Sequence, residues 1–234
     1  MLRRLFGAVV RPAYVWLRRG STDLLFERRY GVRTSGEVDL ETLGIASADR
    51  ERYQPVGWIR LRQVLPRRSV TAEDVFLDLG CGMGRALILA STYPFRRVIG
   101  VELSARLAEI ARHNAEHARV RRRCGEVLVV EADALDYEIP DDVTVVFLNN
   151  PFRGPVFAAV VENVLASHDR RPRRLRIVYG NPIEEPTLLA TGRVELVRVV
   201  RGLRPGEEWS RSNSFRCYEV RGPVTAPPGS GAPA

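Results

Sequence analysis

The chain has 234 residues, of which 45% are hydrophobic and 27% charged, a composition that excludes wholesale disorder. Its net charge is +8, but all 36 basic residues are arginine, so the excess alone does not favour a nucleic-acid partner. Three cysteines without metal or disulfide spacing exclude an oxidised secreted scaffold, and no apolar run approaches the ~20 residues that span a bilayer. We therefore expect a cytoplasmic protein with one main domain and no metal.

The N-terminal part of the sequence is helical in pattern. Residues 1–19 place apolar side chains at helical spacing with arginines between them, which predicts a basic amphipathic helix. Such a helix docks on its own domain, on a partner or on an anionic membrane surface, and we favour packing on protein. Further helices are expected over residues 21–30 and 55–65, so we assign residues 1–70 to an N-terminal helical arm and lid.

From residue 71 onward, short apolar runs alternate with helical ones. Strands are expected over residues 75–79, 98–101, 127–130, 143–148 and 175–179, and helices over residues 85–91, 104–118, 155–166 and 184–190. This alternation predicts a parallel sheet with crossover helices. Two last strands, over residues 194–200 and 214–220, are expected to form an antiparallel hairpin that closes the sheet.

The expected fold is α/β, with a doubly wound, mostly parallel seven-stranded sheet, a C-terminal antiparallel hairpin and an N-terminal helical extension. We assign residues 71–222 to this domain. Residues 223–234 are rich in proline, glycine and alanine, which predicts a disordered tail.

A glycine-rich turn follows the first expected strand, where residues 78–84 read Asp-Leu-Gly-Cys-Gly-Met-Gly. Glycine permits positive φ angles and lets a ligand approach the main chain. An enzyme that binds a dinucleotide would need the spacing Gly-x-Gly-x-x-Gly, whereas Gly80, Gly82 and Gly84 alternate with other residues. The structural alternative is a tight turn that binds nothing.

Polar residues follow the next three expected strands. Glu102 ends the second strand, where a carboxylate can accept hydrogen bonds from both hydroxyls of a ribose, although it could equally favour the start of the next helix. Asp133 and Ala134 follow the third strand, and residues 149–152, Asn-Asn-Pro-Phe, follow the fourth. The carboxyl ends of parallel strands share one edge of the sheet, which is where open α/β proteins bind ligands.

Taken in order over residues 75–152, these motifs resemble those of class I S-adenosylmethionine-dependent methyltransferases. The sequence resembles bacterial members with an Asn-Pro-Phe fourth motif and, more distantly, the non-SET histone lysine methyltransferases. The resemblance implies S-adenosylmethionine as cofactor and places an aspartate and a small residue at the adenine. It implies cofactor contacts from Asp78, Gly80, Cys81, Gly82, Gly84, Glu102, Leu103, Asp133, Ala134 and Asn149, and from Tyr53 in the lid.

The fourth motif resembles the Asn-Pro-Pro-Tyr/Phe motif of amine methyltransferases, in which an asparagine carbonyl helps to hold the acceptor. Only one proline is present here, so the alignment leaves either Asn149 or Asn150 as the catalytic residue that orients the acceptor. The alternative is a loop turn, which asparagine and proline favour in any case. We expect the acceptor site to be lined by Pro151, Phe152, Tyr179 and Asn181.

The predicted function is methyl transfer to a nitrogen or oxygen nucleophile of a small molecule or a protein side chain. The alternative is a non-catalytic scaffold that binds S-adenosylmethionine and recruits a partner or a membrane through residues 1–19. An oxidoreductase ranks third, because dehydrogenases share the acid at the end of the second strand.

Overall fold

The computed structural model describes residues 24–34, 58–149, 152–201 and 214–222. Several sequence-based expectations fall outside these ranges, namely the amphipathic helix over residues 1–19, the lid residue Tyr53, the tail over residues 223–234, and the pair Asn150 and Pro151. Within the described ranges, no helix is both long enough and apolar enough to cross a membrane.

The elements follow the expected alternation. The strands are β1 (Val75–Leu79), β2 (Arg97–Glu102), β3 (Glu126–Glu131), β4 (Val145–Leu148), β5 (Arg176–Gly180), β6 (Val194–Val200) and β7 (Phe215–Val220). The helices are α3 (Trp58–Val64), the short 3-10 turn η2 (Arg67–Ser69), α4 (Arg85–Ala90), α5 (Ala105–His117), α6 (Gly154–Arg170) and α7 (Glu185–Ala190).

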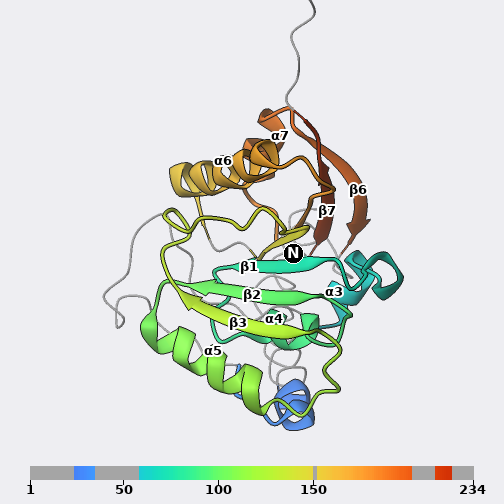
Figure 1. Cartoon of the computed structure of the whole chain (residues 1–234), viewed down its shortest axis with the longest axis vertical. Coiled ribbons are helices and arrows are strands. Elements are labelled where there is room, and N and C mark those ends of the chain that lie inside the picture. The colour runs from blue at the N-terminus through green and yellow to red at the C-terminus, as the bar shows by residue number, and fades with distance from the viewer. Residues whose placement is uncertain (1–23, 35–57, 150–151, 202–213, 223–234) are drawn as a thin grey trace, which may run out of the picture.

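The strands form one seven-stranded sheet in the order β3-β2-β1-β4-β5-β7-β6 (Figure 1). Strands β1 to β5 pair in parallel, whereas β7 is antiparallel to both β5 and β6. This confirms the doubly wound, mostly parallel sheet with its C-terminal antiparallel hairpin. The second strand of the hairpin lies between β5 and the first, so β6 forms the outer edge.

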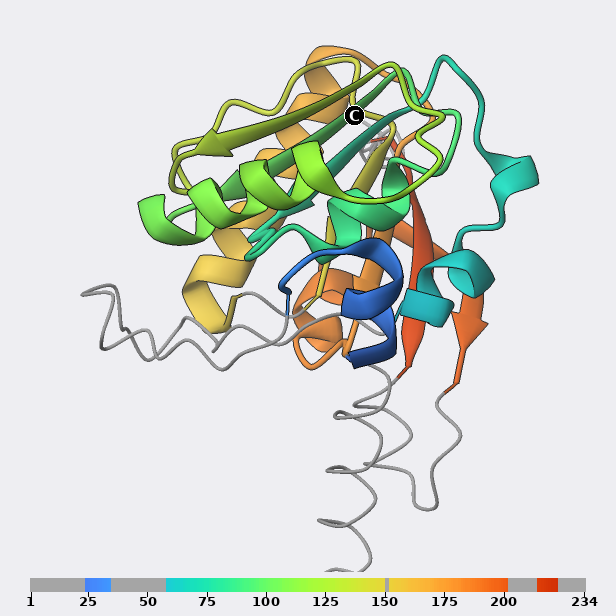
Figure 2. The ribbon, with the colours of Figure 1, turned by 90° about the horizontal axis from the view of Figure 1, so that it is seen from below.

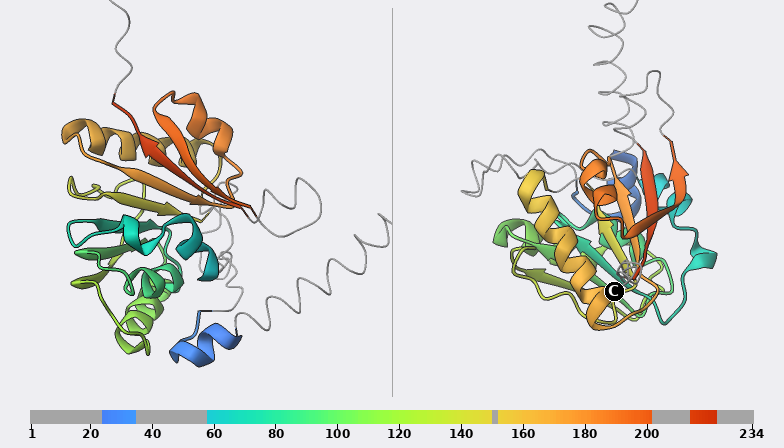
Figure 3. Two further views of the ribbon diagram at one scale, coloured as in Figure 1. Left: turned by 90° about the vertical axis from the view of Figure 1, so that its right-hand side faces the viewer. Right: turned by 90° about the horizontal axis from the view of Figure 1, so that it is seen from above.

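Helices cover both faces of the sheet (Figure 3). On one face, α6 and α7 contribute to an apolar cluster that includes Phe157, Val160 and Leu188. The cluster on the other face receives side chains from α3, α4 and α5. Strands β1, β4 and β5 are buried along their whole length, which explains why their sequences are continuous apolar runs rather than alternating ones.

Residues 24–34, here called the N-terminal segment, belong to the second of these clusters. The segment starts with a helix over residues 24–30 and lies beside α4 in the view from below (Figure 2). Phe26 is fully buried, and Tyr30 and Val32 are nearly so, and all three pack in the same cluster as Phe76 of β1. The segment therefore completes the core on this face of the sheet.

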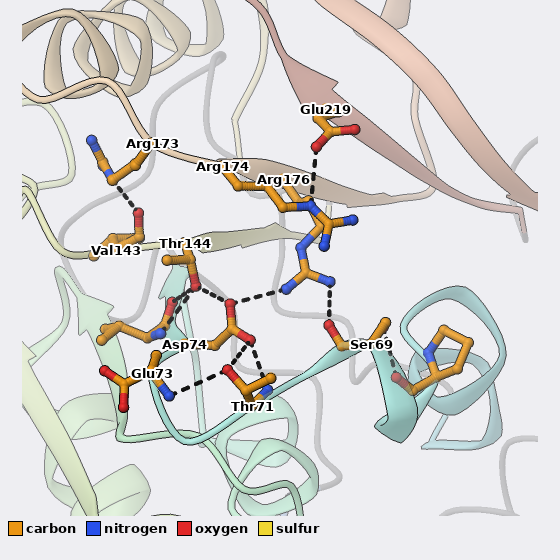
Figure 4. Close-up of polar contacts among 12 residues, drawn as sticks. Ser69, Thr71, Glu73, Asp74, Val143, Thr144, Arg173, Arg174, Arg176 and Glu219 are labelled. Carbon is orange, nitrogen blue, oxygen red and sulfur yellow. Dashed lines mark hydrogen bonds and ion pairs between the residues drawn. The ribbon is translucent and has the colours of Figure 1, made fainter.

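A polar network fastens the amino-terminal edge of the sheet (Figure 4). The carboxylate of Asp74 accepts hydrogen bonds from Thr144 Oγ1 at 2.7 Å and from Arg176 Nη2 at 3.2 Å. Arg176 is buried and also donates to the backbone oxygen of Ser69 at 2.8 Å. These contacts join the amino-terminal ends of β1, β4 and β5. The sequence motifs lie at the opposite edge of the sheet, where the strands end.

Candidate functional site

The glycine turn has the backbone that its sequence favours. The φ angles of Gly80, Gly82 and Gly84 are +79°, +54° and +80°, in the region that glycine adopts without steric cost. The amides of Gly80 and Cys81 both donate to the backbone oxygen of Val101, at 2.9 and 3.0 Å. Helix α4 starts directly after Gly84. The turn is therefore anchored to the end of β2 and leads straight into a helix.

Cys81 occupies the space beside a second tightly packed glycine. A Cβ atom at Gly100, in the middle of β2, would lie 2.8 Å from the Cys81 Sγ and 2.6 Å from a methyl carbon of Leu87. Burial, followed by the nearby negative charge of Asp78, raises the pKa of the Cys81 thiol well above its usual value. Cys81 is thus a neutral packing residue under the turn, and it packs there because residue 100 has no side chain.

Glu102 joins the end of β2 to the glycine turn. Its Oε2 accepts a hydrogen bond from the amide of Gly82 at 2.8 Å, and its Oε1 accepts one from the amide of Ser104 at 3.0 Å. Burial raises the pKa of Glu102, and the backbone hydrogen bonds oppose that rise. Ser104 then accepts from the amide of Leu107 and caps α5. The carboxylate therefore lies directly before the helix start, as one of its two interpretations from the sequence expected, and it also holds the glycine turn, which the sequence did not indicate.

Asp78 is the most electrostatically unusual residue of this edge. Its side chain is only 3% exposed, in the strand that leads into the glycine turn. Burial, followed by the nearby charge of Glu102, raises the pKa of the Asp78 carboxyl well above its usual range. Burial of a carboxylate is costly, and a second carboxylate nearby adds to the cost. Asp78 and Glu102 together make this edge strongly attractive to a positively charged group.

The end of β3 lies beside the end of β2, with Glu131 in register with Glu102. After it, the Oδ1 of Asp133 accepts from the amide of Leu135 at 3.1 Å and shapes a short turn. Ala134 is buried, and its side chain belongs to the cluster beneath α6. Leu103 is half-buried between Glu102 and Ser104. The structure thus brings the second and third motifs side by side, next to the glycine turn.

Asn149 follows β4, the other neighbour of β1. Asp78 is in register with Phe147, so two further steps along both strands place Asn149 beside Gly80. A Cβ atom at Gly180, the last residue of β5, would lie 2.6 Å from the Asn149 Oδ1 and 2.5 Å from the ring of Phe215. The Asn149 side chain therefore rests over the backbone of Gly180, in space that exists because residue 180 is glycine.

Asn181 continues this edge beyond β5. It has a φ of +50°, the one positive φ found outside glycine among the described residues. Its backbone amide donates to Ser214 at 3.0 Å, while its side-chain Oδ1 is buried and has no hydrogen-bond partner within the described ranges. Strained backbone and unpaired buried polar atoms are concentrated at functional sites in proteins. Asn181 combines both features next to Asn149.

The aromatic residues expected near the acceptor lie mostly inside the protein. The side chain of Tyr179 is fully buried, its ring stacks on Phe157 at 5.3 Å, and its hydroxyl accepts from the amide of Glu184. Phe152 is 7% exposed and belongs to the same cluster. In these positions both side chains support the strand ends from the core side.

The sequence motifs did not reveal Gly100 or Gly180, although each is a glycine within or at the end of a strand, which is a recognised sign of close packing. No group of three or more metal-ligating side chains occurs in the part of the chain that the structure describes. All three cysteines are buried thiols.

Residues 76–168 match a family model described as a methyltransferase domain. A ribosomal RNA small subunit methyltransferase A of Methanopyrus kandleri is 36% identical over 90 residues, which is 36% of this chain and 28% of the relative. A histone H3 lysine methyltransferase of Drosophila melanogaster is 29% identical over 114 residues, 45% of this chain and 6% of the relative. The chain thus spans less than a third of the length of either relative.

Among solved structures, an RNA methyltransferase of Salinibacter ruber in complex with S-adenosylhomocysteine has the same fold. It superposes with a TM-score of 0.50 at 18% identity, over 74% of this chain and 97% of that one. The matched domain includes the glycine turn and the acidic residues Asp78 and Glu102 at the strand ends. Residues 76–168 thus match a methyltransferase domain, and the chain has the fold of a solved methyltransferase that binds S-adenosylhomocysteine.

Proposed function

We propose that this protein binds S-adenosylmethionine at the carboxyl edge of β1 to β4 and transfers its methyl group to a nitrogen or oxygen nucleophile. The observation that carries the proposal is the buried carboxyl of Asp78 close to the negative charge of Glu102, directly before the glycine turn. A site of this kind selects a ligand that is cationic and that approaches the backbone closely.

The residues present fit that cofactor. S-adenosylmethionine carries positive charge on its sulfonium and amino groups, and a positive charge next to Asp78 would offset the cost of the buried carboxylate. Glu102 accepts backbone hydrogen bonds from Gly82 and Ser104, and a carboxylate has about four acceptor positions, so Glu102 retains capacity for a ribose hydroxyl. Asp133 and Ala134 lie beyond Glu102, in the place proposed for the adenine.

The cofactor, when bound, supplies a methyl group attached to a positively charged sulfur. The acceptor's lone pair bonds to the methyl carbon while the carbon–sulfur bond breaks and its electrons remain on sulfur. An amine or alcohol acceptor then loses a proton. The task of the protein is therefore to align the acceptor and to exclude water.

We assign the alignment of the acceptor to Asn149 and Asn181. Asn149 follows β4 and lies against Gly180 at the end of β5, and the buried Oδ1 of Asn181, just beyond β5, has no hydrogen-bond partner within the described ranges. Such oxygens hold an acceptor through its N–H or O–H group. The relatives include enzymes named for RNA and for a histone lysine, so the acceptor has to be identified by experiment.

The test is a transfer assay with S-adenosylmethionine labelled on the methyl group and a panel of amines, alcohols, proteins and RNA. We expect label in one class of acceptor. The variant Asn149→Ala should lower turnover by about a hundredfold, because misplacement near the reacting atoms has effects of that size, while cofactor affinity changes little. The matched control is Thr144→Ala at the opposite edge of the sheet, which should leave turnover per folded molecule unchanged.

Binding of the cofactor without transfer to any acceptor would favour the non-catalytic scaffold instead. Wild-type turnover by Asn149→Ala would remove Asn149 from the mechanism.

A further inference from the structure

One buried side chain joins the glycine turn to the N-terminal segment. Asn114, on α5, is 3% exposed. Its Nδ2 donates to the backbone oxygen of Met83 in the turn at 2.9 Å and to the backbone oxygen of Arg33 in the segment at 2.8 Å. Its Oδ1 accepts from the amide of Arg33 at 3.2 Å. Three hydrogen bonds of one amide group therefore bridge two stretches of backbone that are distant in sequence.

A second connection runs from the first residue of α4. Arg85 is 2% exposed, and its Nε donates to Thr34 Oγ1 at 2.9 Å. Its guanidinium carbon lies 4.9 Å from the centre of the Phe26 ring. A buried cation at the start of a helix is unfavourable to the helix dipole and to desolvation. Contacts with the N-terminal segment offset that cost, so the segment stabilises the place where the turn becomes α4.

Helix α5 supports the turn directly as well. A Cβ atom at Gly84 would lie 3.1 Å from the Cβ of Ala111, one helical turn before Asn114 on the same face of α5. At the end of the helix, the amide of Arg119 donates to the backbone oxygen of Tyr30 at 2.7 Å. The turn, α5 and the N-terminal segment thus form one packed unit.

The turn depends on such support because its own sequence gives it little rigidity. Three glycines within five residues lose much conformational entropy when they are fixed. Hydrogen bonds to Val101 and Glu102 hold the part of the turn next to β2, and Asn114 holds Met83 on the side next to α5. Without the Asn114 contact, the backbone oxygen of Met83 would lose its link to α5, and the bond from the Gly84 amide to the Cys81 oxygen would remain.

We propose that Asn114 is a positioning residue for the cofactor, and that docking of the N-terminal segment and binding of the cofactor favour each other. The inference rests on the proposed cofactor site. Coupling of this kind is reciprocal. If the docked N-terminal segment stabilises the turn and thereby favours cofactor binding, the bound cofactor must equally stabilise the docking of the segment.

The first test measures S-adenosylhomocysteine affinity by calorimetry for the full chain and three variants. Asn114→Leu removes all three hydrogen bonds at nearly constant volume, and Thr34→Val removes the hydroxyl that accepts from Arg85 Nε. Thr144→Val is the matched control, since it removes a partly buried hydroxyl from the network at the opposite edge. We expect about tenfold weaker binding for Asn114→Leu, about threefold for Thr34→Val, and an unchanged dissociation constant for Thr144→Val despite a lower Tm.

The second test follows amide hydrogen exchange at Arg33 and Thr34, whose amides donate to Asn114 Oδ1 and Glu27 Oε1. Addition of S-adenosylhomocysteine should slow exchange at both positions in the wild-type protein and much less in Asn114→Leu. A merely structural role for Asn114 would not link exchange in the segment to the ligand.

The outcomes separate the two proposals. Failure of the wild-type protein to bind S-adenosylhomocysteine overturns the proposed function and this inference together. Wild-type binding with unchanged affinity in Asn114→Leu and Thr34→Val overturns this inference alone, as does an equal loss in Thr144→Val. If Asn114→Leu does not fold, Thr34→Val and the exchange measurement on the wild-type protein decide.

Discussion

Asp78 shows how a single residue can be unfavourable for the fold and favourable for a ligand. Burial, followed by the charge of Glu102, raises the pKa of its carboxyl. A folded-state pKa above the unfolded value of about 3.9 means that the native protein holds the proton more tightly than the unfolded chain. The stability associated with that proton is complete below the unfolded pKa and is lost as the pH rises through the folded-state pKa.

The variant Asp78→Asn should therefore have opposite effects on stability and binding. It keeps the shape of the side chain and removes the buried charge, so we expect a higher Tm than wild type at pH 7 and an equal Tm near pH 3. Affinity for S-adenosylmethionine should fall by about 10- to 100-fold, the size expected for losing a charged interaction of ~1.5–3 kcal/mol. Thermal melts across this pH range and calorimetry check both expectations.

The pH dependence of binding is a separate consequence of the same carboxyl. A cationic ligand binds the ionised form of Asp78, so wild-type affinity should increase as the pH rises through the elevated pKa. Titrations at several pH values should show this increase in the wild type and a flatter profile in Asp78→Asn. An equally steep profile in the variant would assign the titration to another group.

At the scale of elements, the site depends on how closely β1, β2 and α4 pack beneath the turn. A methyl group at Gly100 would meet Cys81 and Leu87 at distances that no unstrained structure allows. We expect Gly100→Ala to lower the free energy of unfolding by about 1–3 kcal/mol, the usual cost of overpacking, and to weaken cofactor binding because Cys81 belongs to the turn. Chemical denaturation measures the first effect.

Gly222 provides the control, because a Cβ atom there would contact nothing. Gly222→Ala should change stability by less than about 0.5 kcal/mol, as surface substitutions usually do. If the two alanine variants were equally stable, the close packing around Gly100 would not be a constraint on the site.

Local sequence patterns predicted most elements because their causes are local. Strand β1 was predicted with its observed bounds, and α5 starts at Ala105, one residue after its predicted start, because Ser104 caps it. Helix α6 continues four residues beyond its predicted end at Ala166, because Ser167 and His168 are buried although they are polar. Hydrophobic spacing cannot show such burial. It also could not place β7 between β5 and β6, which depends on long-range pairing.

The same distinction applies to the site. The glycine turn and Glu102 were predictable because each lies in a short motif at a strand end. The roles of Asn114, Arg85 and Thr34 were not, because they arise where the N-terminal segment packs on the turn, and no periodicity connects residues that far apart. Long-range polar contacts of buried residues appear only once the chain is folded.

The molecule as a whole places two different kinds of edge on one sheet. The amino-terminal edge is fixed by the ion pair of Arg176 with Asp74 and by Thr144 (Figure 4). The carboxyl-terminal edge has Asp78 and Glu102 beside a glycine turn, and Asn149 and Asn181 at the next strand ends. The charged contacts that fix the sheet thus lie at the amino-terminal edge. The oxygen atoms that can accept hydrogen bonds from a ligand lie at the carboxyl-terminal edge, where we propose that the cofactor binds.

The central claim is that S-adenosylmethionine binds at this carboxyl edge, and calorimetric titration of the full chain tests it most directly. We expect one binding site per chain with a micromolar dissociation constant. Binding should be weaker by about tenfold or more in a folded Glu102→Ala variant, since a lost hydrogen bond to a carboxylate costs ~1.5–3 kcal/mol. Undetectable binding to the wild-type chain, or equal affinity in the folded Glu102→Ala variant, would contradict the central claim.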